Sequence, residues 1–237
     1  ILATVFLHLA SGSAFFGPAR GGALIVAPRS GRPWEGTVRE TPLDAGLCGQ
    51  QSRLESRSAH RLRAVLERAQ TIQPEDISEE DANRFVEAGY TVRSAVYGTL
   101  PERNTADLFE AVRAITQLDD VDRFLKGGTF LDLGSGEGEL VANALRLHPG
   151  LARSVGVELC GERHRTAEAR AAALPDDLRS KIDYIEADIC DAAHEQVVEA
   201  IASARVILVT SVMFETPLME CLSSLLHDLV ARRGRAA

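Results

Sequence analysis

A short apolar strand that runs directly into a glycine-rich turn constrains this chain more than any other feature. The predicted strand is Thr129–Leu133, the turn reads Gly134-Ser135-Gly136-Glu137-Gly138, and the amphipathic stretch near 138–147 predicts a helix. Glycines adopt backbone angles that side chains forbid and let a ligand approach the backbone closely, while a helix start offers unpaired N–H donors. The segment therefore predicts a nucleotide-cofactor loop.

The spacing of the glycines indicates which cofactor the loop binds. A dinucleotide fingerprint has its third glycine three residues after the second, whereas this chain has Glu139 there and a glycine one residue earlier, at Gly138. An acid at this position disfavours pyrophosphate, and Asp132 and Glu139 suit a ligand with an amine and a sulfonium. The Asp-x-Gly-x-Gly-x-Gly order resembles motif I of class I S-adenosylmethionine (SAM) methyltransferases. The resemblance implies that Asp132, Gly134, Gly136 and Glu139 bind SAM.

Two further predicted strands lead into acids that a nucleoside can use. The stretch Ser154–Glu158 ends in a carboxylate that can accept both ribose hydroxyls, because ligands bind at the carboxyl ends of the strands in a doubly wound sheet. The strand near 182–187 leads into Asp188, which by resemblance to SAM enzymes receives the adenine amino group. Since NAD-dependent enzymes also use an acid like Glu158, they stay open as an alternative.

The segment upstream of the glycine loop narrows the resemblance. Val96-Tyr97-Gly98-Thr99 precedes a helix predicted to begin near Asn104 or Thr105. This order, with Asp-Leu-Gly-Ser-Gly and Gly-Val-Glu after it, resembles the disruptor-of-telomeric-silencing family, the non-SET histone lysine methyltransferases, over about 95–237. The resemblance implies a protein substrate, and Tyr97 is implied to serve both cofactor binding and catalysis.

The same resemblance assigns the remaining catalytic positions. In that family the fourth strand is followed by paired asparagines and aromatics, and here the pair reads Thr210-Ser211, with Phe214 after it. Tyr97 and Phe214 are expected to line an apolar channel, which lowers the pKa of a lysine from about 10.4 by desolvating its ammonium. Ser211 is expected to orient the acceptor or the methionine end of SAM. The lost amides keep two alternatives open: a methyltransferase for a small molecule or non-histone protein, and an inactive SAM-binding scaffold.

The hydrophobic pattern as a whole predicts an α/β fold, a Rossmann-like class I methyltransferase sheet with an N-terminal helical extension. Helices are expected at 78–88, with Ser78 as cap, and at 105–118. Four strands near 129–133, 154–158, 182–187 and 205–209 should alternate with helices near 138–147, 162–173, 191–203 and 216–231. The chain stops where a fifth strand would enter, so we expect a truncated sheet, a bare apolar edge on the fourth strand and a fragment.

The first residues have a different composition. Ile1–Ala10 is an apolar run too short to span a bilayer, small residues follow it, and arginines but no acid occur before Glu35. We interpret 1–35 as a signal/transit-like leader for a plastid, 36–94 as the helical extension, and 95–237 as the methyltransferase domain, C-terminally incomplete. An N-terminal core strand, an incorrect gene start and a nuclear location are the alternatives.

Charge and cysteine content limit the partners. The net charge is −8, and setting aside the three arginines of residues 1–34, which hold no acid, leaves −11 for the rest. A domain with this negative charge repels nucleic-acid phosphate backbones. We interpret the arginines of one predicted helix as a solvated face; they are Arg53, Arg57, Arg61, Arg63 and Arg68. The four cysteines lack metal-ligand spacing, so neither a metal site nor a disulfide is predicted, and no transmembrane segment is expected.

Overall fold

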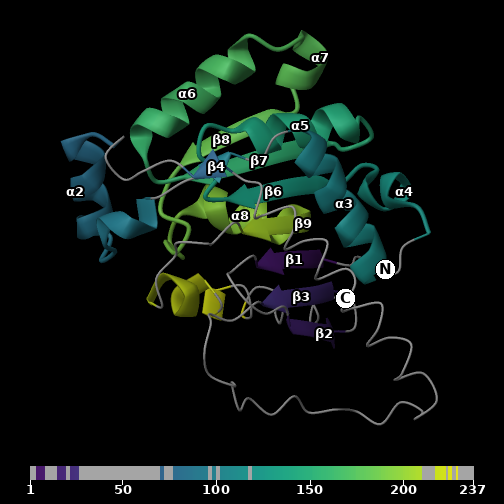
Figure 1. The fold of residues 1–237 in the computed structure, drawn as a ribbon, viewed down its shortest axis with the longest axis horizontal. Coiled ribbons are helices and arrows are strands. Elements are labelled where there is room, and N and C mark those ends of the chain that lie inside the picture. The colour runs from purple at the N-terminus through teal and green to yellow at the C-terminus, as the bar shows by residue number, and fades with distance from the viewer. Residues whose placement is uncertain are drawn as a thin grey trace.

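The structure is a computed structural model that describes residues 4–8, 15–19, 22–26, 70–71, 77–95, 98–99, 102–116, 119–209, 217–222, 224–225 and 228. The described elements form an α/β fold in which helices cover a twisted, mainly parallel sheet (Figure 1). A separate antiparallel ribbon joins β4 (Gln70–Thr71) to β5 (Gly98–Thr99). The fold class predicted from the sequence is confirmed.

The sheet has the strand order β2-β3-β1-β9-β6-β7-β8 in the described part of the chain. Figure 1 shows β2 at one edge and β8 at the other. Every described pairing in this sheet is parallel except that of β2 with β3. The strands are β1 (Thr4–His8), β2 (Phe15–Ala19), β3 (Gly22–Val26), β6 (Thr129–Leu133), β7 (Arg153–Glu158), β8 (Ile182–Glu186) and β9 (Ala204–Val209).

The described helices are α2 (Glu79–Glu87), α3 (Glu102–Thr116), α4 (Val121–Leu125), α5 (Glu139–Leu147), α6 (Gly161–Ala172), α7 (Asp176–Arg179) and α8 (Glu195–Ser203), with a 3-10 turn at Val92–Ala95. The helices predicted near 78–88, 105–118, 138–147, 162–173 and 191–203 are present with shifted ends, whereas the short helices α4 and α7 were not predicted. Residues 217–222 are also helical. The helix expected at 191–203 begins later, at Glu195, because successive turns held by Asp188 and Asp191 precede it. The arginine-bearing helix expected around Arg53 to Arg68 lies outside the described residues.

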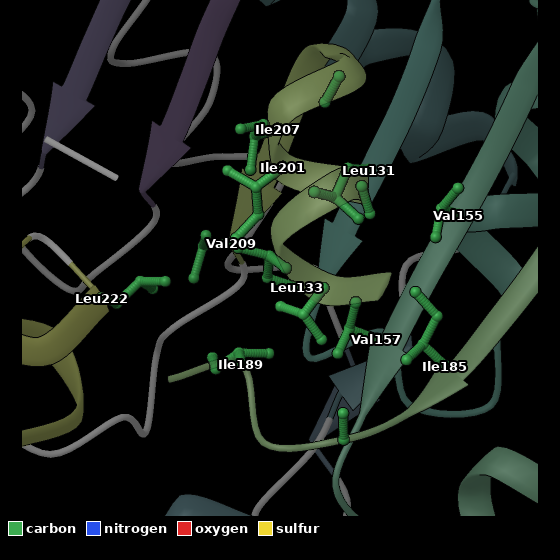
Figure 2. Close-up of a cluster of buried hydrophobic side chains, with 14 of the residues drawn as sticks. Leu131, Leu133, Val155, Val157, Ile185, Ile189, Ile201, Ile207, Val209 and Leu222 are labelled. Atoms are coloured by element: carbon green, nitrogen blue, oxygen red, sulfur yellow. The ribbon is translucent and has the colours of Figure 1, made fainter. Parts of the chain in front are cut away.

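Both faces of the central strands are buried, as is usual in parallel sheets. On one face, Phe130 and Leu208 pack with side chains of α3, α4 and α5. On the other face, Leu131 and Leu133 pack with neighbours from β7, β9 and α8 and with Leu222 (Figure 2). Because successive side chains of a strand alternate between faces, Asp132 shares the face of Phe130. The apolar runs at the sheet centre therefore hold the strand ends, and the acids after them, in fixed positions.

The sequence predicted a bare edge on the fourth strand, and this prediction is wrong. The fourth strand is β9, and β1 pairs with it in parallel register from Val5 opposite Val206 to His8 opposite Val209. The position beside β9 is thus filled from the N-terminal segment. Sequence order did not reveal this because an unpaired strand edge can bind any extended segment that reaches it. The strands β1 to β3 agree with the alternative of an N-terminal core strand, while cleavage of a leader stays a prediction.

Candidate functional site

The glycine loop after β6 folds back onto β7. The backbone N–H groups of Gly134 and Ser135 both donate to the carbonyl of Val157, at 2.9 and 3.0 Å. Gly134, Gly136 and Gly138 have φ values of +81°, +55° and +77°, in the left-handed region that favours glycine. The three glycines are therefore required by the backbone path, and α5 begins directly after them.

A tyrosine that sequence reasoning missed closes one side of this loop. The Tyr184 hydroxyl on β8 donates to the Gly138 carbonyl at 3.0 Å. Asp132, Gly156 and Tyr184 lie opposite one another on β6, β7 and β8. A side chain at Gly156 would collide with both Ser135 and the Tyr184 ring. Only the strand register reveals this row, because nothing in the local sequence relates Tyr184 to the loop.

Glu158 lies against the glycine loop, as the sequence predicted. Its side chain is buried, one carboxylate oxygen accepts the Gly136 N–H at 2.8 Å, and the other accepts the Cys160 N–H at 2.9 Å. The carboxylate therefore joins the loop after β6 to the turn that leads into α6. A carboxylate has about four acceptor positions, so lone pairs remain for the hydroxyls of a ligand.

Asp132 is the most unusual acid of the site. It is 3% exposed, and its Oδ1 atom has no hydrogen-bond partner among the described residues. Burial raises the pKa of Asp132 well above its usual range, and the nearby Glu158 carboxylate raises it further. A cationic group placed beside the two acids would stabilise their charged forms. The arrangement therefore favours a positively charged ligand over a phosphate.

Glu139 has a different environment from the one its sequence position implied. It is the first residue of α5, and Arg170 of α6 forms ion pairs with both Glu137 and Glu139, at 3.7 Å in the second case. The Arg170 guanidinium thus partly neutralises the acids at this side of the loop. The preference of the site for a positively charged ligand therefore rests mainly on Asp132 and Glu158.

Asp188 follows β8 and is held by two donors. Its Oδ1 atom accepts the Cys190 N–H at 2.8 Å, and the Tyr90 hydroxyl lies 3.0 Å from each carboxylate oxygen. Sequence reasoning did not identify Tyr90, which is 98 positions away along the chain. The carboxyl ends of β6, β7 and β8 therefore present Asp132, Glu158 and Asp188 along one edge of the sheet, in the order that the sequence predicted.

The segment Ser78–Tyr90, which we call the α2 clamp, is fastened to the ends of β7 and β8. The Asp81 carboxylate accepts the first N–H groups of α6, from Gly161 at 2.7 Å and Glu162 at 3.2 Å. The N-cap residue of α6, Cys160, makes no side-chain cap of its own. Arg84 forms an ion pair with Glu186 at the end of β8. Figure 1 shows α2 at one end of the sheet, away from α3 and α4.

The charge state of Asp81 follows from these bonds. Burial pushes the pKa of Asp81 upward, but the hydrogen bonds from Gly161, Cys160, Glu162 and Ser78 outweigh this effect and leave it below its usual range. The sequence had identified Ser78 as the cap of α2, and the Asp81 N–H does donate to Ser78 Oγ at 3.1 Å. The role of Asp81 as cap of a second, distant helix was missed.

The three residues predicted to be catalytic, Tyr97, Ser211 and Phe214, lie outside the described residues. Within the described part of the chain, no cluster of three or more histidine, cysteine or acidic side chains is arranged to hold a metal ion. In the same ranges, none of the helices combines the length and apolar character needed to cross a membrane.

Several solved structures resemble this chain, and two of them are methyltransferases. The methyltransferase domain of bacterial CtHen1-CN is 17% identical, with a TM-score of 0.39, and the match covers 50% of this chain and 57% of that one. The glycopeptide N-methyltransferase MtfA, solved with sinefungin, is also 17% identical with a TM-score of 0.39, over 51% of this chain and 43% of that one. The chain therefore matches about half the length of each structure. No curated protein sequence matches it.

The comparison with protein families is more specific. The family described as "Histone methylation protein DOT1" matches residues 89–234, which is more than half of the chain. The match begins within the α2 clamp, covers the glycine loop and all three acids, and confirms the resemblance seen in the sequence. This chain belongs to the DOT1 histone methylation family.

Proposed function

We propose that this chain is a SAM-dependent methyltransferase that methylates lysine in a protein of the histone type. The observation that carries the proposal is the buried, unpartnered Asp132 Oδ1 near the Glu158 carboxylate, at the strand end that leads into a loop of three glycines with left-handed φ angles. A nucleoside ligand that carries a sulfonium and an ammonium suits these two acids electrostatically, whereas a pyrophosphate does not.

Each acid at the sheet edge has a distinct role in this proposal. Asp132 and the glycine loop would hold the charged methionine end, Glu158 would accept the ribose hydroxyls, and Asp188 would accept the adenine amine. Bound SAM supplies an activated methyl group. Because methyl transfer is an in-line displacement, the protein residues mainly have to align the two reactants and exclude water.

Support for a protein-lysine acceptor comes from the family and from charge. The family description names histone methylation. A net charge of −8 attracts basic, lysine-rich segments at long range. Tyr97 and Phe214 remain the proposed walls of the lysine channel and Ser211 its polar contact. The Thr210-Ser211 pair in place of two asparagines favours a second candidate, a methyltransferase for a non-histone protein or small molecule.

Cofactor binding is the first test. We expect S-adenosylhomocysteine to bind the full chain in calorimetry, and Asp132→Ala and Glu158→Ala each to weaken binding at least tenfold. Asp107→Ala, an exposed acid of α3, should bind like wild type. A folded wild-type protein that does not bind S-adenosylhomocysteine, or that binds NADH in competition with it, would contradict the proposal.

Acceptor identity is the second test. We expect labelled methyl transfer from SAM to lysine in core histones or histone peptides, and loss of that transfer when the lysines are replaced by arginine. Transfer to other proteins or to small amines alone would support the second candidate. Cofactor binding without transfer to any acceptor would point to an inactive SAM-binding scaffold.

A further inference from the structure

The Tyr90 hydroxyl is a donor that the sheet itself does not provide. It reaches Asp188 from the end of the α2 clamp and lies 3.0 Å from both carboxylate oxygens, while the Cys190 N–H bonds Oδ1 at 2.8 Å. The terminal torsion of an aspartate is otherwise broad, so these two donors from different segments select one orientation of the carboxylate. The lone pairs that they leave unused remain available to a ligand.

Tyr90 is itself held in place. Its N–H donates to the Phe85 carbonyl at 2.8 Å, directly after Gly89, whose φ is +84°. Its ring packs against the buried cluster of the sheet that includes Ile189, and also against the cluster of Phe85, Ala95 and Cys160. Burial raises the pKa of Tyr90, and the adjacent Cys190 and Asp188 raise it further, so the hydroxyl stays protonated and donates.

An ionised aspartate accepts hydrogen bonds and cannot donate them. Held in one orientation, it pairs with an exocyclic amine and repels a carbonyl oxygen at the same place. Sites built to bond a polar group discriminate strongly against analogues that lack it, because the buried partner is then left unpaired. The selectivity depends on the orientation of the carboxylate, and in this structure that orientation depends on Tyr90.

We propose that Tyr90 is a positioning residue that holds Asp188 so that the site selects an amino-purine cofactor, which makes the α2 clamp part of the cofactor site. This inference rests on the proposed function, because Asp188 can contact a purine base only if a nucleoside binds at this edge of the sheet.

The test uses the full chain and compares two ligands whose purines differ at C6 and in the proton that the neighbouring N1 then carries. S-adenosylhomocysteine carries the exocyclic amine, and S-inosylhomocysteine carries a carbonyl in its place. We expect wild type to prefer the first ligand strongly, and Tyr90→Phe to reduce the affinity ratio about tenfold while leaving the unfolding temperature close to that of wild type. Val86→Ala, an exposed position on α2, is the matched control and should keep the wild-type ratio.

Asp188→Asn supplies a second, independent variant. An amide can donate to the carbonyl of S-inosylhomocysteine, so the preference should collapse or invert. If Tyr90 acts through Asp188, adding Tyr90→Phe to Asp188→Asn should change the ratio no further. A wild-type ratio in Tyr90→Phe, or an equal loss of affinity for both ligands, would overturn the inference. Failure of wild type to bind either ligand would instead overturn the proposed function, and the inference with it.

Discussion

Removing the Asp81 carboxylate should destabilise the domain more than its position on a peripheral helix implies. Asp81 is 2% exposed and accepts two N–H groups at the start of α6. A hydrogen bond to a charged group contributes about 1.5–3 kcal/mol, and loss of a helix N-cap costs about 0.5–2 kcal/mol. Asp81→Ala also removes the acceptor of the buried Gly161 N–H. We therefore expect a loss of about 3 kcal/mol in the free energy of unfolding.

The loss can be measured by urea unfolding of the full chain at neutral pH, followed by circular dichroism. For a chain of this size, 3 kcal/mol corresponds to a fall of roughly 6–12 °C in the unfolding temperature. Asp120→Ala is the matched control, because Asp120 caps α4 through the Arg123 N–H at 3.1 Å but is exposed. It should cost about 0.5–1 kcal/mol.

The two variants should also differ in cofactor binding. The turn from Glu158 to Gly161 links the proposed ribose site to the helix that Asp81 caps, so Asp81→Ala should weaken binding of S-adenosylhomocysteine and Asp120→Ala should not. Equal stabilities of the two variants, or wild-type stability of Asp81→Ala, would refute the reasoning that a distant carboxylate supplies the cap of α6.

Three further predictions concern the same site. The stability difference between wild type and Asp81→Asn should be constant from pH 7 to pH 5 and shrink below about pH 4. The pKa of Asp81 is lower in the folded state, so its contribution to stability is lost as the pH falls from the unfolded pKa of about 3.9 through the folded one. Urea midpoints of the two proteins that stay separated at the lowest pH would contradict this. Gly138→Ala should lower the free energy of unfolding by about 1–2 kcal/mol and weaken cofactor binding, since φ is +77° and a methyl group would collide with Tyr184. The control Gly150→Ala meets only ordinary contacts, so it should change neither stability nor binding. Asp132→Asn should raise the unfolding temperature of the unliganded protein at neutral pH by roughly 2–4 °C, about 1 kcal/mol, because it replaces a buried carboxyl group whose ionisation is unfavourable in the folded state. It should also weaken cofactor binding; lower stability with unchanged affinity would contradict this prediction.

Much of the central fold could be predicted because its signals are local. The apolar run 129–133 and the glycines after it specify a strand, a turn and a helix within a few residues, and the structure places β6 at Thr129–Leu133 as predicted. Asp132, Glu158 and Asp188 could be assigned to one site because the carboxyl ends of neighbouring parallel strands meet at the same edge. The two tyrosines of the site could not be assigned, since Tyr184 reaches the glycine loop through strand register and Tyr90 reaches Asp188 through packing.

The sequence by itself determined the succession of central strands and helices along the chain, the glycine loop and the three acids at the sheet edge. It could do so because backbone conformation and side-chain periodicity depend on residues close together in the chain. Tertiary structure alone decided that Asp81 caps α6, that Tyr90 orients Asp188 and that β1 pairs with β9. Asp81 and Gly161 are 80 positions apart, and Tyr90 and Asp188 are 98. Contacts at such separations form only when packing of the whole sheet and its helices brings the partners together, and no local pattern encodes them.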